Sequence, residues 1–231
     1  MEINFKRKFK NCFIVAEISG NHNKNINHAK KLIYSAKKAG FDAVKLQTYK
    51  ANTITLKSSK KDFLLPKNSP WYLKKNLWNL YKAASTPWNW HYDLFKFAKK
   101  LKINIFSSPC DESAVEFLES INCQVYKIPS PEITHIPLLE KVAKTKKNVI
   151  ISTGLATEKD LDLAVKTIRK FGNNKILITK CTTSYPAPMK ELNLKMINYY
   201  KKRYNCMVGY SDHTIGEVAS ITAVQNGAVL V

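Results

Sequence analysis

Short apolar runs alternate along the chain with longer stretches in which apolar residues recur at helical spacing. This alternation is typical of βαβ units, which build a parallel sheet with helices packed against it. An eighth apolar run begins at Ala228 and reaches Val231, the last residue of the sequence. The complete runs predict seven strands, at residues 13–19, 43–48, 104–109, 125–130, 148–154, 175–181 and 206–212.

The intervening stretches predict helices. Thr157 and Asp160 have the spacing of a capping box, in which two side chains satisfy the first backbone groups of a helix. This box fixes the start of one predicted helix. The apolar spacing places the helices at residues 26–39, 114–120, 137–145, 158–170, 192–202 and 217–225.

The interval between the second and third strands is unusually long. Residues 49–70 show little periodicity, and a helical stretch then runs to Ala84. Thr86 and Pro87 are predicted to cap a further helix, with the proline at its first helical position. Insertions after a strand's C-terminal end are where α/β barrels elaborate their substrate pockets. Eight strands with such an insertion predict an α/β fold of the TIM (β/α)8 barrel type, truncated within the eighth strand.

The composition fits a folded protein. Hydrophobic residues make up 45% and aromatic residues 11% of the 231 residues, which excludes a disordered or collagen-like chain. We expect one domain over residues 1–231. No run approaches the roughly 18 apolar residues of a membrane-spanning helix, so no membrane partner is expected.

The N-terminal sequence and the cysteines bear on the cellular compartment of the protein. A basic cluster within residues 6–10 precedes an apolar run in the order of a signal peptide, but Glu17 ends that run too early. We therefore expect a cytoplasmic protein. The 5 cysteines are odd in number and contain no Cys-x-x-Cys pair, which predicts neither a disulfide framework nor a zinc site.

The net charge of +21 raises the question of a nucleic-acid partner. Proteins that bind nucleic acids gather Lys and Arg on one face, whereas here lysine pairs are spread along the whole chain. We expect no nucleic-acid partner. The overall field still attracts a small anionic substrate at low salt.

Each predicted strand changes from apolar to polar residues near its C-terminal end. In a barrel these ends meet on one face, which is where active sites lie. The polar residues are Glu17 and Ser19, Lys45, Gln47 and Thr48, Ser107 and Ser108, Lys127, Ser130 and Glu132, Ser152 and Thr153, Lys180, Thr182 and Thr183, and Ser211, Asp212 and His213.

Three lysines within or at the ends of strands carry the most information. Lys45, Lys127 and Lys180 are each flanked by apolar residues, and a buried ammonium group needs an anionic partner. One such lysine alone is best explained by a side chain that reaches solvent. Three at matching positions predict an anion site. Three hydroxyls can complete a cradle for phosphate or carboxylate: Ser130, Ser152 and Ser211.

The histidines and glutamates give weaker signals. His213 is a candidate metal ligand with Asp212 as its hydrogen-bonding partner, although a lone histidine is more often a structural loop residue. Glu17 and Glu132 are candidate acid/base groups if their carboxylates face each other. The other histidines receive structural interpretations: residues 21–23 as a turn, and His28, His91 and His135 as structural residues.

Segments along nearly the whole chain resemble, in order, the sialic acid synthase family. They include the motifs Lys45-Leu46-Gln47-Thr48 and Ser211-Asp212-His213-Thr214. Residues 86–91 and 131–134 most resemble the pseudaminic acid branch, with the N-acetylneuraminate and legionaminic acid branches as alternatives. The full set of matching segments is 14–18 with 21–22, 44–48, 106–109, 126–128, 151–154, 181–186 and 209–214.

The resemblance implies an activity. Members condense phosphoenolpyruvate with the open-chain aldehyde of an N-acetylated amino sugar and water, giving a nine-carbon 2-keto acid and phosphate. In the pseudaminic acid branch the sugar is 6-deoxy-AltdiNAc. Glu17 and Glu132 match acidic groups tied to proton transfer or water positioning. The family's substrate contacts fall on Lys45, Gln47, Ser108, Lys127, Ser130, Ser152, Thr183, Tyr185 and Ser211, with Thr183 standing where the sialic acid branch has asparagine.

The resemblance also implies a metal and a partner. His213 matches one of two histidines that hold Mn²⁺ or Mg²⁺, which polarises the aldehyde. The second histidine and an antifreeze-like domain, through which the family forms homodimers, are expected beyond Val231. This leaves two interpretations, a fragment of a longer synthase or an inactive truncated remnant. A Schiff-base aldolase also places lysine at a barrel strand end and is the rival enzyme class.

Overall fold

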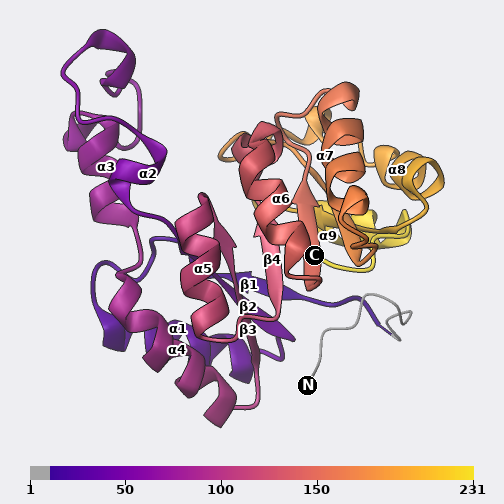
Figure 1. Cartoon of the computed structure of the whole chain (residues 1–231), viewed down its shortest axis with the longest axis horizontal. Coiled ribbons are helices and arrows are strands. Elements are labelled where there is room, and N and C mark those ends of the chain that lie inside the picture. The colour runs from indigo at the N-terminus through magenta and orange to yellow at the C-terminus, as the bar shows by residue number, and fades with distance from the viewer. Residues whose placement is uncertain (1–10) are drawn as a thin grey trace. The chain divides into compact units, whose positions relative to one another are not determined.

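The computed structural model describes residues 11–231 (Figure 1), so the basic cluster at residues 6–10 lies outside the described residues. The chain divides into two compact units. Of the described residues, unit 1 comprises 11–15 and 123–231, and unit 2 comprises 16–122. Strand β1 (Val15–Glu17) crosses the boundary between them.

Unit 2 is built on a pair of parallel strands with helices on one face. Leu46 and Ile33 are fully buried where α1 and α4 pack against this pair, and Leu94 lies in the same core. Strand β2 pairs with β3 from Ala43 opposite Asn104 onward. Its elements are α1 (Ile26–Lys38), β2 (Ala43–Thr48), α2 (Ala51–Ile54), α3 (Leu77–Ala84), α4 (Trp88–Lys100), β3 (Asn104–Pro109) and α5 (Glu112–Ser120).

Side chains of β2 alternate between the helices and the opposite face. Leu46 and Thr48 face the helices, where the hydroxyl of Thr48 lies 2.8 Å from Nε2 of His91 and 2.6 Å from Oγ of Ser107. Because successive strand residues point to opposite faces, Lys45 and the residues two positions away point to the other side.

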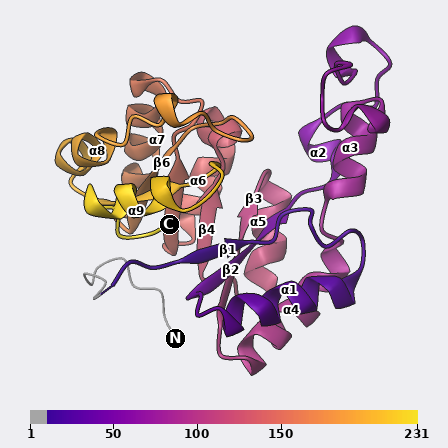
Figure 2. The same ribbon diagram turned by 180° about the vertical axis from the view of Figure 1, so that it is seen from behind.

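Unit 1 holds four consecutive parallel strands, β4 to β7. Val208 and Tyr210 of β7 are buried against α8 and α9 with Ile197 and Ala219. The elements are β4 (Val125–Ile128), α6 (Ile136–Lys144), β5 (Asn148–Ser152), α7 (Glu158–Lys170), β6 (Ile176–Cys181), α8 (Met196–Tyr204), β7 (Met207–Ser211) and α9 (Val218–Gln225), and Figure 2 shows them from behind.

The predicted eighth run lies beside β7. Val229 N–H donates to the carbonyl of Val208 at 2.9 Å, and Tyr210 N–H donates to the carbonyl of Leu230 at 2.7 Å. On its other side, Phe13 N–H donates to Val229 O at 2.9 Å, in a parallel bridge between Phe13 and Leu230. A Cβ on Gly209 would lie 2.6 Å from the Leu230 carbonyl, so this close approach requires glycine.

Most predicted elements are confirmed. The bounds of β2, β3 and α7 are those expected, and both hydrogen bonds of the Thr157–Asp160 capping box are present. Several other strands are shorter than predicted, and the helix predicted from residue 192 begins only at Met196, after a short 3₁₀ turn (Met189–Glu191). These differences lie at element ends, where local pattern is least specific.

The start of α4 differs from the prediction. Pro87 is the residue before the helix, with φ −56° and ψ 130°, and Trp88 is the first helical residue. Thr86 does not cap the helix, because its hydroxyl lies 3.2 Å from Nε2 of the buried His22. Across residues 11–231, we find no helix with the length and apolar character needed to cross a membrane.

Candidate active site

Unit 2 gathers four of the predicted site residues on the face of β2 and β3 that points away from the helices. Lys45 is only 6% exposed, and its ammonium forms an ion pair with Glu17 and donates to Ser108 Oγ at 3.4 Å. Gln47 lies two residues further along the same face, opposite Ser108 in register. The carboxylate of Glu17 also accepts a hydrogen bond from Ser19 N–H at 2.9 Å. The ion pair explains how a strand buries a lysine.

Unit 1 joins two further predicted residues across its sheet. The ammonium of Lys127 on β4 donates to Ser211 Oγ on β7 at 3.0 Å. Strands β5 and β6 lie between them, so a flat sheet would hold β4 and β7 about 14 Å apart. A lysine side chain cannot span that distance. The sheet of unit 1 is therefore strongly curved, with Lys127 and Ser211 on its concave face.

The loop after β5 lies against the ends of β4 and β6. Gly154 N–H donates to Ser130 Oγ at 2.9 Å. A Cβ on Gly154 would lie 1.9 Å from Thr183 Oγ1 and 2.9 Å from both Cys181 Sγ and Ser130 Oγ. Only glycine permits the backbone to approach these side chains so closely. Gly154 thus brings an N–H group, two hydroxyls and a thiol together at the strand ends.

Cys181 lies at the centre of this cluster. Its sulfur is 3.8 Å from Thr183 Oγ1 and 3.9 Å from His213 Nδ1. Burial raises the pKa of the thiol, but hydrogen bonds from His213, Ser152 and Ser130 outweigh this and lower the pKa to about 6. The cluster therefore stabilises negative charge at this position.

His213 is held in a defined orientation. Its Nδ1 donates to the carbonyl of Thr182 at 2.9 Å, which directs the lone pair to Nε2, as in metal-binding histidines. Its ring lies against that of Tyr185, with centroids 4.2 Å apart. Burial lowers the pKa of His213, but the contacts with Cys181 and Thr182 reverse this and raise it.

A model of the NeuB family matches residues 32–231 of this sequence. The chain belongs to the NeuB family. It is 42% identical over 218 residues to the pseudaminic acid synthase of Helicobacter pylori, covering 94% of this chain and 64% of that protein. It is 36% identical to the N,N'-diacetyllegionaminic acid synthase of Legionella pneumophila, covering 95% of this chain and 62% of that relative. The chain thus spans less than two thirds of the length of these relatives.

A solved structure extends this likeness to the fold. The N-acetylneuraminic acid synthetase of Leptospira borgpetersenii superposes with a TM-score of 0.84 at 29% identity, covering 96% of this chain and 72% of that one. The α/β fold with parallel strands that the sequence predicts is thereby confirmed.

Lys180 corrects the expectation of three equivalent lysines. Its ammonium donates to the carbonyl of Cys181 at 2.7 Å and to Thr182 Oγ1 at 3.2 Å. Cys181 is paired in register with Ser211, which places Lys180 on the opposite face of the sheet from the Lys127–Ser211 contact. Burial lowers the pKa of Lys180. The prediction that Lys180 lies at a position matching Lys45 and Lys127 around one anion site is wrong.

Asp212 does not orient His213 as predicted. One of its carboxylate oxygens accepts Thr214 N–H at 2.8 Å and the other accepts the hydroxyl of Ser220, so it stabilises the turn before α9. The backbone carbonyl of Thr182 orients His213 in place of Asp212. Glu132 lies in a 3₁₀ turn (Ser130–Thr134) directly after β4, in unit 1, whereas Glu17 lies in unit 2.

The structure describes the surroundings of His91 and of the predicted metal ligand His213. His91 is fully buried, and burial lowers its pKa to about 4, which confirms the structural interpretation. Within residues 11–231, no three His, Cys, Asp or Glu side chains are grouped so as to hold a metal ion. His213 fits one ligand position and does not make a metal site alone.

Two residues of the cluster escaped the sequence analysis. The sequence pattern does not single out Gly154 or Cys181, because the glycine stands within a motif and the cysteine spacing bears only on disulfides and zinc. The signal was their position, since Gly154 follows a Ser-Thr pair at one strand end and Cys181 precedes a Thr-Thr pair at the next.

Proposed function

We propose that this NeuB-family chain carries the condensing part of a nonulosonic acid synthase. The reaction joins phosphoenolpyruvate to the aldehyde of 6-deoxy-AltdiNAc and adds water, giving pseudaminic acid and phosphate. The relatives named pseudaminic acid synthase, at 42% and 41% identity, support this sugar over the legionaminic alternative at 36% and 37%.

The Lys127–Ser211 contact is the observation that carries the proposal. A cation that reaches across the concave face of four strands, with Ser130, Ser152 and Thr183 at neighbouring strand ends, suits a phosphate or carboxylate. Phosphoenolpyruvate carries both groups. Lys45, Gln47 and Ser108 of unit 2 offer the same chemistry and are proposed as substrate contacts. Tyr185, a residue that is 64% exposed and whose ring lies beside His213, is proposed as a further contact.

The fold proposed for this activity is a TIM (β/α)8 barrel. Two features of unit 1 support it. The sheet curves strongly between β4 and β7, and the segment at residues 229–231 hydrogen-bonds to β7 on one side and to residues 13–15 on the other. A first strand joined to a last strand in parallel is the connection that closes such a barrel.

We propose that His213 is one ligand of a divalent cation, Mn²⁺ or Mg²⁺. When bound, such a cation polarises a carbonyl oxygen as a Lewis acid. The Nδ1 hydrogen bond to Thr182 supports this role because it holds Nε2 in the ligating tautomer. The other ligands would be water or substrate oxygens.

In the proposed reaction, the enol carbon of phosphoenolpyruvate attacks the aldehyde carbon, and water adds to the cationic carbon that results. The tetrahedral intermediate then collapses with cleavage of the C–O bond and loses phosphate. Lys127 and its hydroxyl neighbours hold the departing anion. Glu17 and Glu132 are the proposed groups for proton transfer or water positioning.

The test is phosphate release from phosphoenolpyruvate with manganese. 6-deoxy-AltdiNAc, N-acetylmannosamine and a no-sugar control are compared, with Lys127→Ala as the blank and Lys201→Ala, an exposed α8 lysine, as the matched control. Sugar-dependent release that Lys127→Ala alone abolishes supports the proposal. No release with any sugar from folded protein contradicts it and favours an inactive remnant. Trapping of a carbonyl substrate by borohydride would favour an aldolase instead.

A further inference from the structure

A buried chain of hydrogen bonds in unit 2 lies directly behind two of the proposed substrate contacts. Its members are His91, Thr48 and Ser107, and all three side chains are fully buried. The hydroxyl of Thr48 lies between the other two, 2.8 Å from Nε2 of His91 and 2.6 Å from Oγ of Ser107. The bonds join a helix to two strand ends, because His91 belongs to α4, Thr48 ends β2 and Ser107 lies in β3. The proposed reaction uses none of these three residues.

Each hydrogen bond in this chain has a defined direction. Nδ1 of His91 lies 3.2 Å from the carbonyl of Pro87, which can only accept, so Nδ1 carries the proton. The imidazole is neutral, because burial lowers the pKa of His91 to about 4. Nε2 therefore has a free lone pair, and the hydroxyl of Thr48 donates to it. Since Thr48 has only one hydroxyl proton, Ser107 donates to the oxygen of Thr48.

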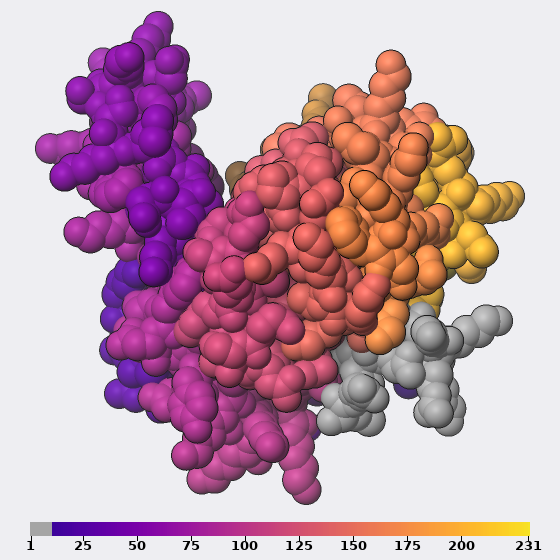
Figure 3. Space-filling view, viewed as in Figure 1, coloured from indigo at the N-terminus to yellow at the C-terminus, as the bar shows by residue number. Residues whose placement is uncertain are grey.

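His91 is a fixed reference point within unit 2. Its ring packs edge-on against that of Phe117 on α5, with centroids 5.3 Å apart. Leu94, one turn further along α4, is fully buried in the core. The magenta atoms of α4 and α5 form much of the lower surface of unit 2 in Figure 3. The position of the imidazole is thus set by two helices, and the end of β2 is held against it.

The chain alternates with proposed substrate contacts along both strands. Gln47 precedes Thr48, and Ser108 follows Ser107. Gln47 and Ser108 are also paired in register. Because successive strand residues point to opposite faces, fixing Thr48 and Ser107 on the helix side fixes their neighbours on the other side. The bond between Thr48 and Ser107 therefore holds the two substrate contacts at a constant spacing.

We propose that His91 is a positioning residue, which holds Gln47 and Ser108 in the geometry that binds phosphoenolpyruvate. This role rests on the proposed function. His91 does not touch the substrate, since it lies on the helix side of the strands. Without an acceptor at Nε2, the buried hydroxyl of Thr48 must turn to another partner, because an unmade buried hydrogen bond is costly. The end of β2 then shifts, and Gln47 shifts with it.

Two substitutions of similar chemistry separate this role from simple packing. In His91→Gln the amide oxygen can take the place of Nε2 and accept from Thr48, whereas in His91→Asn the shorter amide reaches only the place of Nδ1, beside Pro87. His91→Asn is expected to raise KM for phosphoenolpyruvate at least about tenfold with kcat within about twofold, because uniform binding is lost. His91→Gln is expected to regain most of this loss. Steady-state phosphate release at varied phosphoenolpyruvate measures both.

Leu94→Ala is the matched control. It removes buried packing from the same helix without touching the hydrogen-bonded chain. Urea denaturation is expected to show a loss of stability, while KM stays at the wild-type value.

Nitrogen-15 NMR gives a second readout that needs no substrate. The ring of His91 is expected in the tautomer protonated at Nδ1. The backbone amide signals of Gln47 and Ser108 are expected to shift in His91→Asn and to lie near their wild-type positions in His91→Gln. If the wild-type chain releases no phosphate, the catalytic proposal fails, whereas these signals still decide the role of His91.

Three results overturn the role proposed for His91. The first is a wild-type KM in His91→Asn together with unmoved amide signals. The second is an equal loss in His91→Gln and His91→Asn that Leu94→Ala reproduces, which would be a packing effect. The third is a tautomer protonated at Nε2, which would direct a donor at Thr48 and reverse the chain.

Discussion

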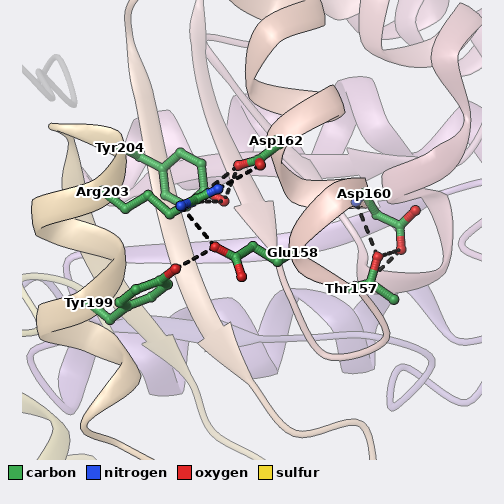
Figure 4. A network of polar contacts seen from close by, with 7 residues as sticks. All are labelled: Thr157, Glu158, Asp160, Asp162, Tyr199, Arg203 and Tyr204. Atoms are coloured by element: carbon green, nitrogen blue, oxygen red, sulfur yellow. Dashed lines mark hydrogen bonds and ion pairs between the residues drawn. The ribbon is translucent and has the colours of Figure 1, made fainter.

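Two clusters of unit 1 perturb the pKa values of their members, and they do so for different reasons. One is the strand-end cluster of Gly154, Cys181 and His213, with their hydroxyl neighbours. The other joins α7 to α8 on the surface (Figure 4), where Arg203 lies 2.9 Å from Glu158 Oε1 and 2.7 Å from Asp162 Oδ2. Both contain shifted groups, so a shift alone does not identify a site.

The surface network is already satisfied by its own charges. Hydrogen bonds from Arg203 and Tyr204 lower the pKa of Asp162, and in turn the hydrogen bond to Asp162 raises that of Arg203. An open hollow of about 640 Å³ lies beside it, lined in part by these residues. One arginine of α8 paired with two carboxylates of α7 explains the network as surface stabilisation.

The strand-end cluster has a different composition. It consists of hydroxyls, a backbone N–H, a thiol and an imidazole on the concave face of a sheet that also carries Lys127. Hydroxyls donate or accept as a ligand requires. A candidate site is therefore marked by hydrogen-bonding groups at the strand ends that can turn from each other to a ligand, and not by charges already paired with each other. Four predictions test this distinction.

The largest effect is expected from Lys127→Ala. Removing the cation that reaches Ser211 takes away charge stabilisation for the phosphate group, so kcat/KM for phosphoenolpyruvate falls at least about a hundredfold. Steady-state phosphate release measures this. A variant that retains most of its activity while staying folded would remove Lys127 from the site.

Gly154→Ala is expected to reduce both stability and activity. The new Cβ would lie 1.9 Å from Thr183 Oγ1, and the overpacking costs about 1–3 kcal/mol in the free energy of unfolding. Urea denaturation measures this loss. Adding Thr183→Ala removes the nearest atom and restores part of the stability. Full stability in the single variant would show that the loop moves freely, against the close approach described here.

These residues show how far the sequence could predict the site. Alternation of apolar and polar positions predicts the bounds of β2 and β3 correctly, because strand periodicity is local. That Lys45 and Ser108 share one face follows only from the pairing register of the two strands. Lys180 was misplaced because a shift of one residue turns a strand side chain to the other face.

Other parts of the site depend on contacts between distant segments. His213 is oriented by the carbonyl of Thr182, 31 residues away, and a backbone acceptor leaves no mark in the sequence. The close approach of Gly154 to Thr183 likewise exists only once the strands are side by side. Such features become visible only in the folded chain.

Cys181→Ser is expected to change the pH dependence of stability. The folded pKa of this thiol is lowered to about 6 from an ordinary value of 9.0, so between these values only the unfolded state binds the proton. Wild-type stability therefore rises with pH over this range relative to the serine variant. His213 acts oppositely just above its ordinary pKa of 6.5, because its folded pKa is raised. Urea unfolding of wild type and Cys181→Ser at several pH values measures the free energy of unfolding. If it changes with pH in the same way for the two proteins, the lowered pKa of Cys181 is contradicted.

The smallest effect is expected from Arg203→Ala, which removes the centre of the surface network. Phosphate release should stay at the wild-type level, because the ion pairs with Glu158 and Asp162 involve no strand-end group. The melting temperature should fall slightly, and the difference should shrink as salt is added, since exposed pairs are screened. A loss of activity comparable with that of Lys127→Ala would instead make the α7–α8 surface part of the site. The distinction between the two clusters would then fail, because satisfied ion pairs would be doing the chemistry assigned to groups that can change partners.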